Sequence, residues 1–348
     1  MAAALKDPVD LSIGQPHHDV PDAVKESAIR AIREGKNRYT PTQGHPDLVA
    51  ALTERIAKTT STDGKRLFVT SGVSGGLFLA FATLVNPGDE VLMGDPYFVV
   101  YQQVVSFLGG VPVPVDTYPD FRLTAERIEP LVTERAKMLI VASPCNPTGV
   151  VSTENELREI AELARKHDLL VLSDEIYGVF SYDGPAPGMA PIYEKTLLLS
   201  GFSKSHAAPG WRIGYAFGPT GIIDEMAKLQ QYTFVCAPAP AQAAVLENLD
   251  LDTTAITDAY RPKRDLICEG LAEKYELVRP GGAFYVFPKT PWGTDVEFVE
   301  GAIRNNVLII PGSIFSRRGT HFRVSYATDD ETIRRGIEIL NRVADLGK

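Results

Sequence analysis

The chain has 348 residues, of which 44% are hydrophobic and 23% are charged, a composition typical of a soluble globular protein with room for two lobes. Its formal charge of −9 argues against nucleic acid or an anionic membrane as the main partner, because phosphates attract lysine and arginine. The longest wholly apolar windows, such as Leu77–Ala82, are much shorter than the ~20 residues of a membrane-spanning helix.

The first seven residues have no basic start followed by an apolar stretch, so we expect no secretion signal. Three widely spaced cysteines, Cys145, Cys236 and Cys268, form no CxxC pair and no cluster with histidine. The sequence therefore predicts neither a disulfide framework nor a metal site, and it favours a reduced, cytoplasmic setting.

The amino-terminal segment predicts a short extended piece at Leu11–Pro16 and two helices. One helix begins at Pro21 and ends before Gly35, and the other covers Pro46–Lys58. Proline is favoured in the first turn of a helix and glycine just after the last, which sets these boundaries.

Apolar runs and helical patterns alternate between residues 66 and 217. The expected strands are Arg66–Thr70, Glu90–Met93, Val111–Val115, Met138–Ala142, Leu169–Ser173, Thr196–Leu199 and Ile213–Phe217. Helices are expected between many of them, at Gly75–Val85, Tyr97–Leu108, Thr124–Glu134 and Glu154–His167. Most of the strands are continuous apolar runs, as in a parallel sheet covered on both faces. The alternation predicts one doubly covered α/β sheet.

The remaining chain predicts a smaller α+β region. Helices are expected at Ile222–Gln231, Gln242–Leu249, Thr253–Tyr275, Asp295–Asn305 and Glu331–Ala344. Strands are expected at Leu277–Val278, Phe284–Phe287, Val307–Ile310 and His321–Tyr326. We therefore expect a large domain of residues 40–235 and a small domain formed by residues 1–39 together with 236–348.

The loop after the first strand of this sheet, Ser71–Gly76, is rich in glycine and leads into a helix. An anion such as phosphate fits such a loop, because a helix start offers unpaired N–H groups; a plain tight turn is the alternative. The run Gly72–Gly76 also fits G-x-S-x-G, the nucleophile elbow of serine hydrolases, with Ser74 as the nucleophile. Asp174 followed by His206 or His321 would complete the hydrolase order.

Polar and aromatic residues follow the other strands, at the edge where open α/β sheets bind ligands. Tyr97 follows the second strand and is either a packing tyrosine or a stacking platform. Asn146 lies between two prolines that fix the backbone, and its amide can both donate and accept. Asp174 comes at a strand tip, with Tyr177 one turn later, and a buried aspartate there requires a cationic partner.

Lys204 follows the strand Thr196–Leu199, and Arg212 lies eight positions further on. A solvated loop lysine is one interpretation, since most lysines are exposed. The other is a nucleophile, because a nearby fixed cation lowers the pKa of a lysine and its neutral amine can attack a carbonyl to form a Schiff base.

Taken together, these motifs resemble those of the class I/II aminotransferases, pyridoxal-phosphate enzymes of fold type I. The resemblance extends from Leu11–Pro16 to Phe322–Tyr326, and its most specific segments are Asn146–Gly149, Ser173–Tyr177 and Ser203–Lys204 with Gly210–Tyr215. It implies a large domain with a mainly parallel seven-stranded sheet covered by helices, and a smaller α+β domain. It also implies transfer of an amino group between an L-amino acid and a 2-oxo acid.

The resemblance assigns Lys204 the Schiff base with pyridoxal phosphate and the proton transfer between the substrate Cα and the cofactor. Asp174 would keep the pyridine nitrogen protonated, so that the ring takes up electrons, and a carboxylate beside that cation has a lowered pKa. Asn146 and Tyr177 would bond the phenolic oxygen of the ring, and Tyr97 would stack on its face.

The phosphate site implied by the resemblance consists of Gly72, Val73 and Ser74 at a helix start, completed by Ser203 and Arg212. Arginine suits this task because its forked donors match a phosphate. Gly201, three positions before the lysine, stands where many relatives have Ser or Thr, which implies one phosphate hydroxyl fewer.

Substrate would be held by Arg323, which clamps the α-carboxylate with the help of Asn146 and the backbone of Gly14. Tyr39 resembles a tyrosine that reaches the cofactor phosphate of a neighbouring subunit. The resemblance therefore implies a homodimer with shared active sites.

Three alternatives remain at this stage. The same fold and cofactor also support lyases, decarboxylases and synthases, because a fold does not fix the reaction. A serine hydrolase using Ser74 would leave Lys204, Arg212, Asn146 and Arg323 without roles. A non-catalytic regulatory module would not need the lysine. The sequence does not identify the amino donor.

Overall fold

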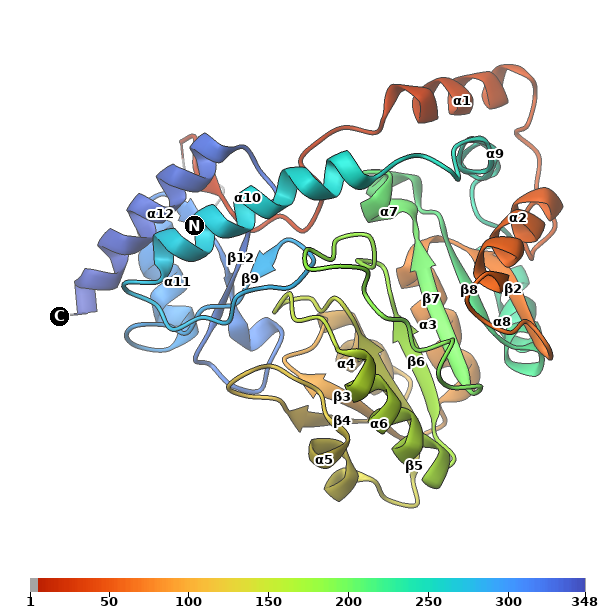
Figure 1. Ribbon diagram of the computed structural model, residues 1–348, viewed down its shortest axis with the longest axis horizontal. Coiled ribbons are helices and arrows are strands. Elements are labelled where there is room, and N and C mark those ends of the chain that lie inside the picture. Colours follow the sequence, from red (N-terminus) through yellow and green to blue (C-terminus); the bar gives the residue numbers. More distant parts are fainter. Residues whose placement is uncertain (1–5, 348) are drawn as a thin grey trace.

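The computed structural model describes residues 6–347, and a seven-stranded sheet forms the centre of its larger part (Figure 1). The strands in spatial order are β2 (Lys65–Thr70), β8 (Gly214–Pro219), β7 (Thr196–Gly201), β6 (Leu170–Asp174), β5 (Ala136–Ala142), β3 (Glu90–Asp95) and β4 (Val111–Asp116). Only β8 runs antiparallel to its neighbours. The predicted mainly parallel sheet is confirmed, with strand ends within two residues of those expected.

Helices cover both faces of this sheet. The helices α3 (Gly72–Leu84), α4 (Val99–Phe107) and α8 (Thr220–Tyr232) share one apolar cluster, in which Phe81, Val105 and Met226 are fully buried. The other face packs on α5 (Ala125–Ile128) and α6 (Glu154–Lys166), through Ile128 and Ile160. Covering both faces explains why the strands are continuous apolar runs. The helix α3 begins three residues before the predicted Gly75, because Gly72–Gly76 forms its first turn.

The carboxy-terminal region forms a second, smaller core. Its antiparallel sheet has the order β11 (Ile310–Pro311), β12 (Phe322–Ser325) and β9 (Tyr285–Val286), and β1 (Val9–Asp10) pairs with β10 (Val307–Leu308). Three helices pack around these strands: α10 (Thr254–Leu271), α11 (Asp295–Arg304) and α12 (Asp330–Ala344). The predicted strand Leu277–Val278 is wrong: that segment is irregular, and its two side chains pack into different apolar clusters.

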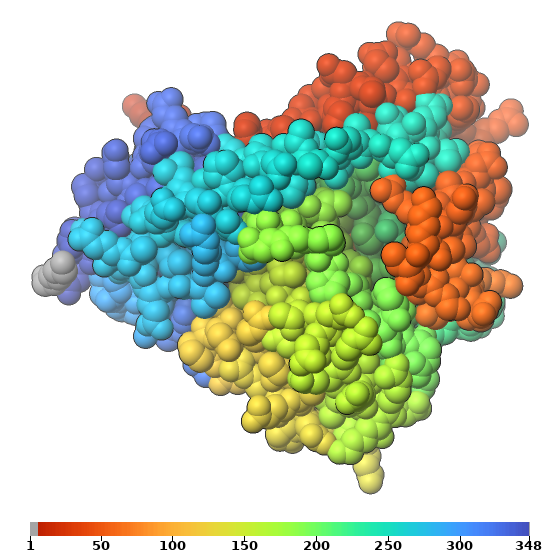
Figure 2. All heavy atoms as spheres, viewed as in Figure 1, coloured from red at the N-terminus to blue at the C-terminus, as the bar shows by residue number. Residues whose placement is uncertain are grey.

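The helices α1 (Asp22–Arg33), α2 (Pro46–Ala57) and α9 (Ala239–Glu247) lie at the end of the molecule that carries β2 and β8, away from α11 and α12 (Figure 1), and α2 and α9 pack on these strands. The helix α1 packs on α9, with Val24 and Ala244 fully buried next to Ala208. In Figure 2, α10 forms a ridge from the blue carboxy-terminal elements to the red amino-terminal segment. The division at residues 40 and 235 stays a prediction, and its residues 1–5 and 348 lie outside the described part. Within residues 6–347, no helix is both long and apolar enough to cross a membrane.

Candidate active site

A cavity opens at the carboxyl ends of the parallel strands and is also lined by β9 and β12. Its volume, with the open mouth and the solvent in it included, is about 770 Å³. Ten of the thirteen predicted site residues line it: Gly14, Val73, Ser74, Asn146, Asp174, Tyr177, Ser203, Lys204, Arg212 and Arg323. Residues that are far apart in the sequence therefore share one site.

Lys204 projects into this cavity from the short helix α7 (Phe202–Ser205), directly after β7. Its Nζ donates to the carbonyl oxygen of Gly14 at 2.6 Å. Burial, Arg323 and Arg212 together lower the pKa of Lys204 to about 8. Lys204 is thus a partly buried amine that is neutral far more often at neutral pH than an ordinary lysine, not the solvated loop lysine of the other interpretation.

Asp174 ends β6 and is buried at the bottom of the cavity. Its Oδ2 accepts from the Tyr101 hydroxyl at 2.7 Å, and its Oδ1 accepts from the backbone N–H of Ile176 at 3.2 Å. Burial nevertheless raises the pKa of Asp174, and the hydrogen bonds and Lys204 oppose this rise. The lowered pKa was expected for the carboxylate beside a pyridinium cation, and it stays a prediction; in the chain alone burial sets the direction.

Tyr177 and Asn146 lie beside Lys204 and are buried. The Tyr177 hydroxyl is 2.7 Å from the Tyr285 hydroxyl. The Asn146 Oδ1 accepts from Arg323 Nη1 at 3.1 Å. That bond occupies the amide oxygen, so the amide Nδ2 is left as a donor for an oxygen in the cavity.

Arg323 comes from β12 and is only 7% exposed. Besides its bond to Asn146, its Nη2 donates to the Ser12 carbonyl oxygen at 2.8 Å. Its Nε is buried without a hydrogen-bond partner among the described residues. An unsatisfied buried donor on a cation is costly, so this position suits an anionic ligand such as a carboxylate.

A second cation, Arg212, lies at the start of α3. Its Nη1 donates to the Pro209 carbonyl oxygen at 2.9 Å, and its guanidinium lies against Gly72. A Cβ at Gly72 would come within 2.5 Å of Arg212 Nη2, and the φ of Gly72 is +70°, so glycine is required there twice over. Val73 and Ser74, in the first turn of α3, line the same end of the cavity. A helix start beside an arginine is a suitable phosphate site.

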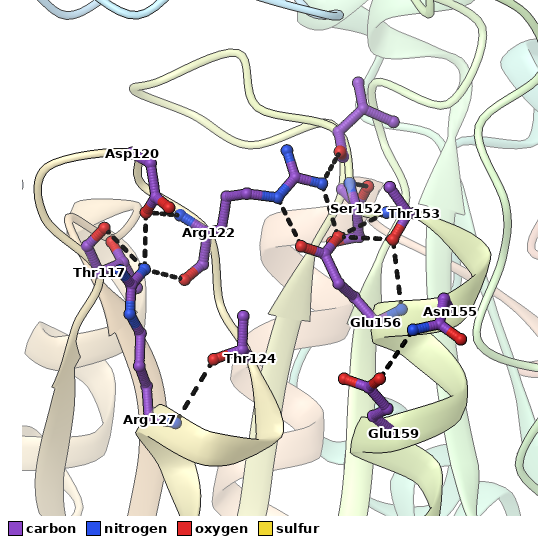
Figure 3. Close-up of polar contacts among 12 residues, drawn as sticks. Thr117, Asp120, Arg122, Thr124, Arg127, Ser152, Thr153, Asn155, Glu156 and Glu159 are labelled. Carbon is purple, nitrogen blue, oxygen red and sulfur yellow. Dashed lines mark hydrogen bonds and ion pairs between the residues drawn. The ribbon is translucent and has the colours of Figure 1, made fainter.

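The structure corrects the position of Tyr97, which does not line this cavity. Tyr97 faces a second, smaller cavity with Arg122 and Cys145, because its backbone N–H is fixed to the Phe315 carbonyl oxygen at 2.7 Å. The neighbouring Phe98 lines the main cavity instead. Figure 3 shows the wall of the smaller cavity, where Arg122 Nη2 donates to Glu156 Oε2 at 2.6 Å and joins the loop after β4 to the start of α6.

Two further predicted residues lie outside the cavity lining. Gly72 lies directly beneath Arg212. Tyr39 is 82% exposed, and the structure does not bring it to this chain's own cavity. Gly201 is paired with Gly214 across β7 and β8, and a Cβ there would lie 2.9 Å from the Gly214 Cα. A serine or threonine at position 201 therefore does not fit this backbone.

The described residues do not form the Ser–His–Asp triad that the serine hydrolase alternative requires. Ser74 and Asp174 line the cavity, but no histidine of the described chain does. The His206 ring is bonded to the Ser205 hydroxyl and the Asn248 carbonyl oxygen. The His321 ring is stacked on Phe287. Residues 6–347 also contain no group of three His, Cys, Asp or Glu side chains arranged to hold a metal ion.

Sequence reasoning missed three aromatic residues of the cavity. Phe98 is adjacent to the chosen Tyr97, and Tyr101 follows Phe98 by one helical turn, a spacing that could have indicated it. Tyr285 lies within an apolar strand, and only its pairing with β12 brings it beside Arg323. No local signal marks it.

Comparison with known proteins identifies the class. Residues 6–340 match the family described as "Aminotransferase class I and II". An aspartate/prephenate aminotransferase from Thermus thermophilus is 40% identical over 97% of this chain and 91% of its own length. The chain belongs to this family of pyridoxal-phosphate-dependent enzymes of fold type I, and it is an aminotransferase acting on amino acids and 2-oxo acids.

Two solved aminotransferase structures share the fold of this chain over nearly its whole length. Aspartate aminotransferase from Thermus thermophilus with maleate superposes with a TM-score of 0.92 at 38% identity, covering 97% of this chain and 92% of that one. Aromatic aminotransferase from Pyrococcus horikoshii OT3 superposes with a TM-score of 0.93 at 34% identity, covering 99% and 97%. Relatives with different amino donors are thus equally similar in fold.

Proposed function

We propose that Lys204 is the residue that attaches pyridoxal phosphate and moves the proton during amino-group transfer. The observation that carries this proposal is the position of a partly buried amine, with its pKa lowered to about 8, in one cavity with Asp174, Arg212 and Arg323. Each of the three has a separate electrostatic task there. When bound, the cofactor supplies an electrophilic carbonyl and a ring that takes up electrons from the substrate Cα.

The cofactor is held at three points in this proposal. Arg212, Val73, Ser74 and Ser203 bind the phosphate, because the first turn of α3 and a guanidinium meet there. Asp174 binds the pyridine nitrogen, and a protonated nitrogen is the cation that its buried carboxylate needs. Phe98 lines the same cavity and takes the stacking role expected of Tyr97.

The phenolic oxygen of the ring is bonded by Tyr177 and by Asn146, whose Nδ2 is free to donate. Arg323, a buried cation that lines the cavity beside Asn146, binds the substrate α-carboxylate. Lys204 Nζ would serve as the base that takes the proton from the substrate Cα and the acid that gives it back. A neutral amine is required for this step, and the lowered pKa provides it.

The experiment that tests this assignment is chemical trapping. Purified protein is mixed with pyridoxal phosphate, reduced with borohydride and digested, and mass spectrometry locates the modified peptide. We expect the label on Lys204 and loss of turnover in Lys204→Ala. The control Lys195→Ala, a surface lysine paired with Asp168, should be labelled and active like the wild type. Label on another lysine, or normal turnover in Lys204→Ala, would sink the assignment.

We also propose that the protein is a homodimer with shared sites. Large aromatic side chains are exposed at three positions: Tyr39 is 82% exposed, Tyr232 is 83% exposed, and Phe234, which packs on Phe78 of α3, is 40% exposed. Exposed patches of this kind typically mark interfaces. Sedimentation should give twice the chain mass. Mixing Lys204→Ala with Tyr39→Phe should restore activity, because one site of the mixed dimer would then have both residues; no restoration would contradict sharing through Tyr39.

Two further proposals concern the location of the protein in the cell and its domain boundaries. We propose a cytoplasmic location, which cell fractionation checks. We propose the division into domains at residues 40 and 235, which limited proteolysis of the linking segments checks.

A further inference from the structure

We infer that Tyr285 is a positioning residue that serves both ends of the reaction, its hydroxyl through Tyr177 and its ring through Arg323. The inference rests on the proposed function, since it takes Tyr177 to bind the cofactor and Arg323 to bind the substrate. Tyr285 lies in β9, is 1% exposed and lines the cavity.

The hydroxyl acts through Tyr177. The two phenol oxygens are 2.7 Å apart, and each phenol has only one proton to donate. If Tyr177 donates its proton to the phenolic oxygen of the cofactor, Tyr285 must be the donor within the pair. The order is then Tyr285 to Tyr177 to cofactor, and a phenol that accepts a hydrogen bond becomes a better donor.

The ring acts on Arg323. The guanidinium carbon lies 4.6 Å from the centre of the Tyr285 ring and 4.7 Å from that of Phe315, so the cation is enclosed by two rings. The pairing of Ser325 with Tyr285 brings β9 beside the strand that carries Arg323. Cation–π contacts of a desolvated guanidinium are worth more than exposed ones. The ring therefore helps to hold the guanidinium ready for a carboxylate.

The amino-terminal segment passes directly against this phenol. A Cβ at Gly14 would lie 2.7 Å from the Tyr285 hydroxyl oxygen. Gly14 also offers its carbonyl oxygen to Lys204. Tyr285 therefore lies against Gly14, which accepts a hydrogen bond from Lys204, and it also contacts Tyr177 and Arg323. Its hydroxyl contacts Tyr177 and its ring contacts Arg323, so the two effects can be separated.

Two substitutions separate the effect of the Tyr285 hydroxyl from the effect of its ring. Tyr285→Phe removes the hydroxyl and keeps the ring, and Tyr285→Leu removes both. Tyr326→Phe is the matched control, because Tyr326 is a buried tyrosine of the same core that bonds Tyr182 and the Ala283 carbonyl oxygen outside the cavity lining. The readouts are the pH midpoint of the visible band of the pyridoxal-phosphate-loaded protein and the apparent KM of an amino donor that bleaches the wild-type band, chosen from L-aspartate, L-alanine and L-phenylalanine.

We expect the midpoint to rise by about half a unit in Tyr285→Phe. A hydrogen bond to the negative ring oxygen lowers the proton affinity of the nitrogen that joins Lys204 to the cofactor, so weakening that bond raises it. The KM should stay within about twofold in this variant, because the ring remains. In Tyr285→Leu the midpoint should rise equally and the KM should increase about 3- to 30-fold. The control should change neither.

An unchanged midpoint in Tyr285→Phe, with a normal wild-type band, would overturn the inference and leave the proposed function intact. So would a KM in Tyr285→Leu equal to that of Tyr285→Phe. If the wild type forms no visible band with pyridoxal phosphate, the proposed function and the inference fall together. Should the leucine variant fail to fold, the phenylalanine variant alone still decides the hydroxyl effect.

Discussion

The two arginines of the cavity are built in opposite ways. Arg212 is half-buried, and its guanidinium bonds backbone carbonyl oxygens and rests on Gly72. Arg323 is buried, is enclosed by two aromatic rings and keeps an unpaired Nε. A cation held by backbone dipoles at a helix start suits a permanently bound anion, such as the cofactor phosphate. An incompletely hydrogen-bonded cation suits an anion that binds and dissociates in each cycle, such as the substrate carboxylate.

Both arginines also act on Lys204, which lines the same cavity. Both arginines lower its pKa, and Arg323 has the larger effect after burial. The same two cations that bind the expected anions thus keep the amine reactive before either anion arrives. The substitutions below test whether the two arginines have the separate roles proposed.

The largest effect is expected from Arg323→Leu. Losing a buried charged partner costs about 2–5 kcal/mol, so kcat/KM should fall roughly 30- to 5,000-fold, with affinity for pyridoxal phosphate nearly unchanged. The thermal midpoint of the unloaded protein should change little, because removal of an incompletely bonded buried charge offsets the loss of its bonds to Asn146 and Ser12. Steady-state kinetics and calorimetry measure both. Arg304→Leu, an exposed position on α11, is the control, and equal losses in both variants would break the comparison.

Arg212→Gln should act on the other ligand. Losing a charged hydrogen-bond partner of the phosphate costs about 1.5–3 kcal/mol, so the dissociation constant of pyridoxal phosphate should rise roughly 10- to 150-fold. At saturating cofactor the KM of the donor should stay within about threefold of the wild type. Absorbance titration of the unloaded protein gives the constant, and Arg66→Gln, a surface ion pair with Asp224, is the control. A large change in donor KM with unchanged cofactor affinity would reverse the assignment.

Gly72→Ala should produce a weaker form of the Arg212 defect. The new methyl group would displace the guanidinium of Arg212. The alanine must also adopt the positive φ of Gly72, which costs about 1 kcal/mol. We expect cofactor affinity to fall about 3- to 10-fold by the same titration. The control is Gly210→Ala, where a Cβ meets nothing within 4 Å. Equal behaviour of the two alanine variants would show that the packing of Gly72 on Arg212 is unimportant.

The smallest effect is expected in the pH dependence of cofactor attachment. With a pKa of about 8, half of the Lys204 amine is neutral at pH 8, so the rate of band formation should rise with pH, with its midpoint near pH 8, and level off above it. Removing a nearby cation raises a lowered lysine pKa, so Arg323→Leu and Arg212→Gln should both move the midpoint upward, the former more. Stopped-flow absorbance measures it, and a downward shift in either variant would contradict the electrostatic account.

Much of the fold could be predicted because its strands are buried on both faces and read as apolar runs. The start of α3 was placed too late, since Gly72–Gly76 resembles a turn and its helical state depends on packing against the sheet. Leu277–Val278 is apolar for a different reason, because each side chain packs on a different cluster.

Site residues at strand ends could be predicted because parallel strands end at one edge of the sheet. The choice between Tyr97 and Phe98 could not, since adjacent side chains point in different directions and the backbone between β3 and α4 decides which one enters the cavity. The two roles of Tyr285 depend on strand pairing and a contact between hydroxyls, which no local pattern encodes.

The close pairing of Gly201 with Gly214 limits which side chain position 201 can carry. A Cβ at Gly201 would lie 2.9 Å from the Gly214 Cα, and a Cβ at Gly214 would lie 2.9 Å from the Gly72 carbonyl carbon and 3.0 Å from the Val73 nitrogen. A side chain at position 201 would therefore push β7 away from Gly214 and Ile213, and glycine at position 214 lets β8 approach the start of α3. The two glycines together let β7, β8 and the start of α3 pack in direct contact beside the phosphate end of the cavity.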